Sequence, residues 1–189
     1  MAKWLKKGYI YKGLKTVYWC PHCETALAEA EIEYNDDKSF SIYVKFKSVD
    51  VSGHMPKDAD PEKVFALIWT TTPWTIPCNL AISANENLEY VWVRVGDEYL
   101  LMAKERVDVT MQAGKVTDYE VLPDVMTGKQ LEGMVFMHPF YDRKVPVILG
   151  DHVTLEAGTG LVHTAPDHGQ DDFDVCMKYE AGASSLGHC

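Results

Sequence analysis

The sequence contains no apolar run near the roughly 18 residues that a membrane span requires, and its N-terminus lacks the features of a secretion signal. It also has no P-loop, no G-x-G-x-x-G nucleotide-binding pattern and no G-x-S-x-G nucleophile turn. Its five cysteines are an odd number without disulfide-like spacing, which favours thiols or metal ligands. These absences predict a cytoplasmic protein with no membrane partner.

Positive charge is scarce as well, because the 189 residues carry a formal net charge of −10. Residues 1–16 are the exception, with five lysines and no acid. Such a run is more often a solvated terminus than an arm that contacts phosphates. A polyanionic partner would therefore have to be met locally, since the remaining surface repels it.

A metal-like spacing occurs in "WCPHC", where Cys20 and Cys23 stand as in a zinc knuckle. A structural zinc site needs four ligands, and the sequence offers no second pair of this kind. The motif therefore predicts half of a zinc site, and an unpaired knuckle is the simpler interpretation.

The hydrophobic pattern predicts a chain dominated by short strands. Residues 39–47 alternate with period two, and residues 63–69 form a nearly continuous apolar run typical of a central strand. Residues 89–95 and 98–103 flank a Gly-Asp turn and predict a hairpin. Helices are expected over residues 104–114, ended by a glycine, and over residues 169–182, where Phe173, Cys176 and Met177 share helical spacing.

Further short strands are expected between residues 118 and 166, and residues 49–63 are expected to form an exposed loop. The pattern as a whole predicts a mainly β fold with peripheral helices (α+β), as a mainly antiparallel barrel or sandwich. We expect residues 1–38 to be a lead-in segment of the same unit, residues 39–180 the main domain and residues 181–189 a tail.

The stretch "LIWTTTPWTIPCN", residues 67–79, is polar where a strand leaves the core. Four threonines and a tryptophan lie around Pro73 and Pro77. The stretch is either a stiff polar turn or the wall of a binding site, because prolines restrict the backbone and threonines supply donors and acceptors.

A second polar stretch, residues 156–174, contains a glycine-rich bend, a short strand and then Asp167, His168, Asp171 and Asp172. A helix N-terminus stabilises a carboxylate, so we expect the pKa of the last two acids to be lowered. They would then hold a cation, either a metal or an ammonium group, rather than act as general acids. A metal site with His163 and His168 is one option, although the spacing matches no zinc motif.

Together the two stretches carry a family resemblance. "WTTTPWTIPCN" resembles the threonine-rich peptide of the editing domain inserted in bacterial isoleucyl-tRNA synthetases, and "GTGLVHTAPDHGQDDF" resembles the second signature of that domain. Valyl and leucyl relatives typically have arginine where this sequence has Thr72, before the proline. The resemblance extends from about residue 3 to residue 179. The synthetase signatures "HIGH" and "KMSKS" are absent, so the resemblance covers an editing domain without an aminoacylation site.

The resemblance implies an antiparallel β-barrel-like domain of class I aminoacyl-tRNA synthetases. Its substrates would be valyl-tRNA(Ile) and valyl-adenylate, with isoleucine excluded by size, because one methylene gives only limited discrimination in a first site. Its partners would be the valine-carrying acceptor end of tRNA(Ile) and the rest of the synthetase. Editing would need no cofactor, and a zinc ion could be held through Cys20 and Cys23 in the full-length enzyme.

Carried over by position, Asp172 matches the acid that binds the α-ammonium group, and His163 matches the histidine beside the side-chain pocket. Thr70, Thr71, Thr72 and Thr75 match the threonine-rich wall that contacts the ester and the terminal ribose. With no obvious general base, water would be positioned by threonine hydroxyls and backbone groups. The other residues implied to bind substrate are Trp74, which would help to close the pocket, Asn79 and Gly160.

One residue departs from the family pattern, since Asp167 stands where glycine is expected. Two other functions remain open from the residues alone. One is a non-catalytic tRNA-binding or zinc-knuckle module, based on the lysines and the Cys20/Cys23 pair. The other is a metal-dependent hydrolase built on His163, His168 and the aspartates.

Overall fold

The computed structural model describes residues 2–11, 15–36 and 38–179. Its contacts divide the chain into two compact units, Met1–Asp37 and Lys38–Cys189, which are described separately. The expected tail, residues 181–189, lies outside the described residues, as does the end of the helix expected to reach residue 182.

The first unit is small and largely exposed. It contains α1 (Ala2–Lys6), a two-stranded antiparallel ribbon of β1 (Tyr18–Cys20) and β2 (Thr25–Leu27), and the 3-10 turn η1 (Glu29–Glu31). Cys20 pairs with Thr25, so Cys20 and Cys23 both lie at the turn of this ribbon.

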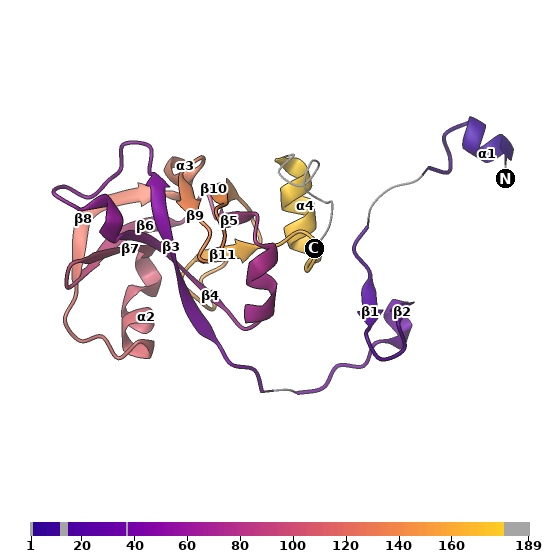
Figure 1. Cartoon of the computed structure of the whole chain (residues 1–189), viewed down its shortest axis with the longest axis horizontal. Helices are drawn as coiled ribbons and strands as arrows, with labels where there is room; N and C mark the ends of the chain where they lie inside the picture. The colour runs from indigo at the N-terminus through magenta and orange to yellow at the C-terminus, as the bar shows by residue number, and fades with distance from the viewer. Residues whose placement is uncertain (1, 12–14, 37, 180–189) are drawn as a thin grey trace. The chain divides into compact units, whose positions relative to one another are not determined.

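The second unit is built on a nine-stranded sheet, counted over the described residues, in the order β11-β5-β10-β9-β3-β4-β7-β6-β8. Figure 1 shows these strands with the helices around them. The strands are β3 (Ile42–Asp50), β4 (Val64–Thr70), β5 (Ala81–Ala84), β6 (Glu89–Val95), β7 (Glu98–Ala103), β8 (Glu120–Thr127), β9 (Val135–Met137), β10 (Lys144–Leu149) and β11 (Leu161–Thr164).

Neighbouring strands run antiparallel except in two pairs, β4–β7 and β5–β10, which are parallel. The prediction of a mainly β fold with peripheral helices is confirmed, but the sheet is mixed and no closed barrel forms among the described residues. Strands β11 and β8 are its two edges. Crossover connections produce the parallel pairs, because two strands joined by a tight turn can only run antiparallel.

Strand patterning explains most of these elements. Strand β4 is buried at most positions, as its continuous apolar run predicts, and the β6–β7 hairpin has the expected bounds. Strand β5 was not expected, because its sequence Ala-Ile-Ser-Ala has few of the β-branched and aromatic residues that mark strands. All four of its residues are nonetheless buried.

The core packs around the large side chains of Trp92, Tyr90, Phe46 and Phe136. The Tyr90 hydroxyl donates to the Gly160 carbonyl at 2.8 Å, and burial raises the pKa of Tyr90 to about 12. These buried aromatic rings supply much of the apolar area removed from water, the main driving force for folding.

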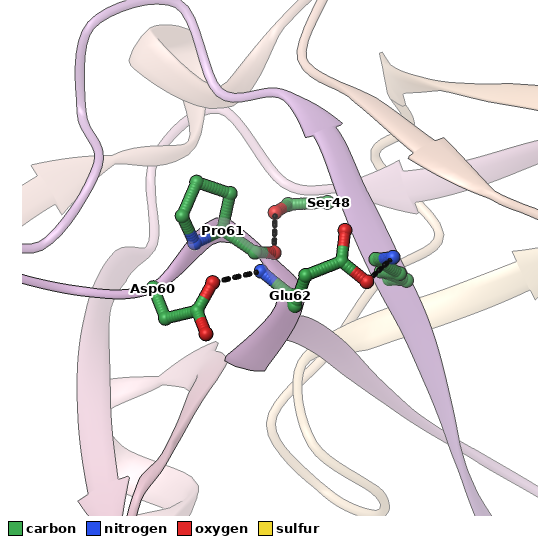
Figure 2. Close-up of polar contacts among 5 residues, drawn as sticks. Ser48, Asp60, Pro61 and Glu62 are labelled. Carbon is green, nitrogen blue, oxygen red and sulfur yellow. Dashed lines mark hydrogen bonds and ion pairs between the residues drawn. The ribbon is translucent and has the colours of Figure 1, made fainter.

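Residues 49–63 are less exposed than expected. Strand β3 continues to Asp50, and Val51 is buried. The 3-10 turn η2 (Pro61–Lys63) is capped by the Asp60 carboxylate, which accepts from the Glu62 amide at 3.0 Å, while the Ser48 hydroxyl donates to the Pro61 carbonyl at 3.3 Å (Figure 2). These bonds tie the end of the loop to β3.

The helical elements of this unit are short. Besides η2 they are, over the described residues, η3 (Pro73–Cys78), η4 (Lys104–Arg106), α2 (Val107–Ala113), α3 (Gly128–Leu131) and α4 (Gln170–Lys178). The helix expected over residues 104–114 is confirmed, with a 3-10 first turn. Helix α4 lies beside β11 and β5 (Figure 1) and buries Val175 and Cys176 against Ala81 and Ile148. Met177, which shares the helical spacing of Phe173 and Cys176, is 45% exposed.

Candidate functional site

The threonine peptide, defined as residues 70–79, begins where β4 ends and continues through η3. The Thr70 hydroxyl accepts from the Thr72 amide at 3.0 Å, and the Thr75 hydroxyl donates to the Thr72 carbonyl at 2.8 Å. Pro73 opens the 3-10 turn, where a fixed φ and a missing N–H cost nothing. The peptide is thus a stiff turn whose hydroxyl groups are held in place by its own backbone.

His163 reaches this peptide from β11, where it pairs with Ile82 of β5. Its Nε2 lies 2.7 Å from the Thr75 hydroxyl oxygen, and its Nδ1 lies 3.1 Å from the Asn79 amide nitrogen. The Thr75 hydroxyl already donates its proton to the Thr72 carbonyl, so the proton between Thr75 and His163 belongs to Nε2 of His163. Nδ1 of His163 therefore accepts from the Asn79 amide group.

The imidazole of His163 is therefore neutral and held at both nitrogens. Burial, with smaller contributions from the charges of His168 and His138, lowers its pKa from 6.5 to about 4. Its Nδ1 lone pair is already engaged, so His163 is poorly suited to accept a proton from water.

Asp172 comes from the first turn of α4, which follows Gly169 at the N-cap. Its Oδ2 accepts from the Ala165 amide at 3.2 Å. Burial raises the pKa of Asp172, although the Ala165 N–H and the charges of His152 and His168 oppose that rise. The predicted lowering is wrong for this residue, because the loss of solvent outweighs the stabilisation expected at a helix N-terminus. Asp171 is exposed to solvent.

A single cleft of about 500 Å³ brings these groups together. This volume lies within the roughly 300–1,000 Å³ usual for small-molecule sites. Of the predicted site residues, those that line it are Thr70, Thr71, Thr72, Trp74, Thr75, Gly160, His163 and Asp172.

Two predicted residues are placed differently from what the resemblance implied. Trp74 lines the cleft but is 69% exposed, so it stands at the rim. Asn79 is fully buried and does not line the cleft. Its side chain donates to His163 and to the Ala81 carbonyl, and its Oδ1 has no hydrogen-bond partner among the described residues. Asn79 therefore acts on the cleft through His163. Asp167 is exposed and lies outside the lining.

The glycine-rich bend before β11 forms another wall, with Gly158 and Gly160 at φ +71° and +77°. A side chain at Gly160 would place Cβ 2.4 Å from the Cβ of Ala103. Between them Thr159 is fully buried, and its hydroxyl donates to the Leu67 carbonyl at 2.6 Å. The Arg106 guanidinium donates to the Gly158 carbonyl at 2.8 Å.

The sequence interpretation missed these supports and also missed His152, which lines the cleft. In the sequence, the two glycines on either side of Thr159 were the available signal for this residue. Neither Arg106 nor His152 belongs to a sequence motif that would indicate a role at the cleft.

The cysteine pair of the predicted half zinc site lies in the first unit. The Cys23 amide donates to Cys20 Sγ at 3.4 Å, and this bond, with smaller effects of the Cys23 thiol and the His22 amide, lowers the pKa of Cys20. A lowered thiol pKa favours the thiolate that binds metals. Over the described residues, however, no group of three or more His, Cys, Asp or Glu could hold a metal ion. In the same part of the chain, no helix has the length and apolar character to cross a membrane.

Comparison with known proteins gives consistent matches. A profile of the family described as tRNA synthetases class I (I, L, M and V) matches residues 1–148. An isoleucine–tRNA ligase of Caldicellulosiruptor saccharolyticus is 56% identical over 175 residues, which cover 92% of this chain and 19% of that protein. One from Mannheimia succiniciproducens is 52% identical over 189 residues, covering 98% and 20%. The chain spans about a fifth of the length of these relatives.

Solved structures match the fold. The editing domain of the cytosolic leucyl-tRNA synthetase from P. knowlesi has a TM-score of 0.60 at 12% identity, over 76% of this chain and 64% of that one. Its P. falciparum counterpart has a TM-score of 0.54 at 14% identity, over 69% and 49%. At such identities the likeness concerns the fold alone.

Proposed function

The chain belongs to the class I tRNA synthetases of the I, L, M and V type and has the fold of a synthetase editing domain. We propose that it hydrolyses valyl-tRNA(Ile), in which valine is wrongly attached, and valyl-adenylate. Isoleucyl-tRNA(Ile) would be spared. The observation that carries the proposal is the single cleft lined by the threonine peptide, His163 and Asp172. It is the kind of hollow that an aminoacyl ester requires, with hydroxyls along one segment and a carboxylate on another.

Asp172 supports this substrate class through its charge. The lining residues, all within the described chain, include no lysine and no arginine. A half-buried carboxylate without such a partner gains from a cationic ligand, because the cation offsets the lost solvation of the anion. The α-ammonium group of an aminoacyl ester is a cation of suitable size, and we assign it to Asp172.

His163 supports the exclusion of isoleucine. Because both ring nitrogens are engaged, the imidazole cannot swing aside without losing the bonds to Asn79 and Thr75. A larger side chain would have to displace a buried, hydrogen-bonded ring, and the cost of that displacement opposes the roughly 1–3 kcal/mol that one methylene gains in an apolar pocket. The cleft would therefore admit an isopropyl group and refuse a sec-butyl group.

Hydrolysis in this site would depend on orientation rather than on a strong base. The water oxygen attacks the ester carbonyl carbon, the bond to the ribose oxygen breaks, and the ribose hydroxyl leaves with a proton. Thr71 and Thr72 present exposed hydroxyl and backbone groups that can place the water, and a free ribose hydroxyl of the terminal adenosine can assist.

The proposed partners follow from this chemistry. They are the acceptor end of tRNA(Ile) and the rest of a cytoplasmic synthetase. The chain would contact the tRNA over only a small part of its surface, because its net charge of −10 repels a polyanion. We propose that editing uses no cofactor, and that a zinc ion at Cys20 and Cys23 would need further ligands from the longer protein.

Two neighbouring acids provide a matched test of the ammonium site. Asp172→Asn should lower the rate of valyl-tRNA(Ile) hydrolysis by about 100-fold, because it removes the charge but keeps the shape. Asp171→Asn changes an exposed acid one residue away and should keep the wild-type rate. Equal rates for the two variants would contradict the ammonium assignment.

Two histidines of the cleft provide a test of the sieve. His163→Ala should allow isoleucyl-tRNA(Ile) to be hydrolysed, whereas His168→Ala, which changes an exposed lining residue, should not. The assay is release of labelled amino acid from each charged tRNA. If His163→Ala still spares isoleucine, the sieve does not depend on this ring.

A further inference from the structure

The far side of the threonine peptide is held by the turn between β9 and β10, residues 138–143. The Arg143 guanidinium donates from Nη1 to the Asn79 carbonyl at 2.8 Å and to the Pro77 carbonyl at 3.2 Å. His138 lies 2.8 Å from the Ile76 carbonyl through Nε2. Two side chains of one turn thus hold three carbonyl groups at the end of η3.

The 138–143 turn is itself rigid. Nδ1 of His138 accepts from the amides of Phe140 and Tyr141, both at 3.1 Å, so Nε2 carries the proton and donates to Ile76. The Tyr141 ring stacks on His138 with 5.0 Å between centroids, and the Arg143 guanidinium lies 5.5 Å from the Tyr141 ring. His138 is only 3% exposed. The donors that face η3 are therefore preorganised.

A continuous line of bonds leads from this turn to the cleft. Arg143 fixes the backbone of Asn79, and the Asn79 side chain donates to Nδ1 of His163. His138 fixes Ile76, which follows Thr75 directly, and Thr75 accepts from Nε2 of His163. Both partners of the His163 ring are thus attached to a segment that the 138–143 turn holds from behind.

We propose that the 138–143 turn, through Arg143 and His138, is a positioning element that fixes the orientation of the His163 ring and of the threonine peptide. Neither residue lines the cleft, so neither touches the substrate. The expected consequence for selectivity rests on the proposed function, whereas the expected consequence for the His163 ring rests on the hydrogen bonds alone.

Two variants of Arg143 separate positioning from simple stability. Arg143→Met removes the guanidinium and keeps much of the apolar stem. Arg143→Lys keeps the charge but replaces the planar guanidinium, whose Nη1 meets both carbonyls, with a shorter ammonium group that is not held in the same place. Lys144→Met is the control, since it removes an exposed cation from the next residue.

The first readout is the His163 ring, followed by long-range proton–nitrogen NMR correlation in the whole chain. Wild type and Lys144→Met should show one neutral tautomer with the proton on Nε2. Arg143→Met should show a mixture of tautomers, with Arg143→Lys in between. An unchanged His163 spectrum in Arg143→Met overturns the proposal. If that variant does not fold, the same comparison with Arg143→Lys decides.

The second readout is the ratio of isoleucyl-tRNA to valyl-tRNA hydrolysis. That ratio should rise about tenfold in Arg143→Met, with partial recovery in Arg143→Lys, because a loosened ring discriminates less well against one methylene. A purely structural role would lower both rates together and leave the ratio unchanged, which would contradict the proposal. If wild type hydrolyses neither substrate, the proposed function fails, and the NMR comparison still tests the positioning role.

Discussion

Acidification should destabilise the chain in part by protonating the buried imidazole of His163. His163 accepts from Asn79 and donates to Thr75, so an added proton on Nδ1 would point at the Asn79 amide group. Burial also penalises the charged ring. The perturbation is therefore a fall in pH from 7.5 to 4.5, compared between wild type and His163→Gln.

The magnitude follows from the pKa of His163, which burial lowers from 6.5 to about 4 in the folded chain. Between these pH values the unfolded chain binds more protons than the folded one. The contribution of the neutral His163 ring to the unfolding free energy is therefore complete above pH 6.5 and is lost as the pH falls toward 4. At pH 4.5 the loss from this group amounts to about 2.5 kcal/mol of unfolding free energy.

Urea unfolding at the two pH values, followed by tryptophan fluorescence, measures this loss. Burial also lowers the pKa of His138 and raises that of Asp172, so only the difference between wild type and His163→Gln isolates the group. The pH-dependent loss should be about 2.5 kcal/mol smaller in His163→Gln. The exposed residue His22, changed to Gln, should leave the loss as in wild type. Equal losses in wild type and His163→Gln would refute a buried neutral imidazole.

Two further predictions concern backbone space and metal dependence. Gly160→Ala should cost about 2–4 kcal/mol of unfolding free energy, since it adds both left-handed strain and a clash with Ala103. Gly96→Ala, with φ +61° and open space around it, should cost only about 1–2 kcal/mol, and equal costs in urea unfolding would contradict the clash. A chelator such as EDTA should leave valyl-tRNA hydrolysis unchanged, because the proposed steps use protein side chains, backbone groups and a ribose hydroxyl of the substrate, and none of them uses a metal ion. Loss of activity that zinc restores would favour a metal-dependent hydrolase.

Local pattern was sufficient for much of the fold. The β6–β7 hairpin and the helix after it follow from two apolar segments, a Gly-Asp turn between them and a terminal glycine. Strand β5 did not follow, because tertiary burial rather than propensity makes Ala-Ile-Ser-Ala a strand. The open, mixed form of the sheet depends on crossovers between distant segments, which periodicity does not encode.

The sequence indicated two segments that line the cleft, but it did not indicate the ionisation of the groups in them. The threonine peptide and the second polar stretch were marked by composition and by resemblance, and the structure places both at one cleft. The pKa of Asp172 was predicted in the wrong direction, because position in a helix is local whereas burial depends on the assembled cleft. The same reason hid the role of Asn79, whose partner His163 is 84 residues away in sequence.

Strand β5 contributes no side chain to the cleft, yet two of its residues contact elements that carry lining residues. Ala81 packs beneath α4, the helix that bears Asp172, and Ile82 pairs across the ladder with His163. A bulkier residue at Ala81 would press against Val175 and Cys176 of that helix without altering any residue that lines the cleft. The distance between the Asp172 carboxylate and the His163 ring therefore depends in part on a buried strand. Related domains could change their selectivity through the size of residues that do not contact the substrate.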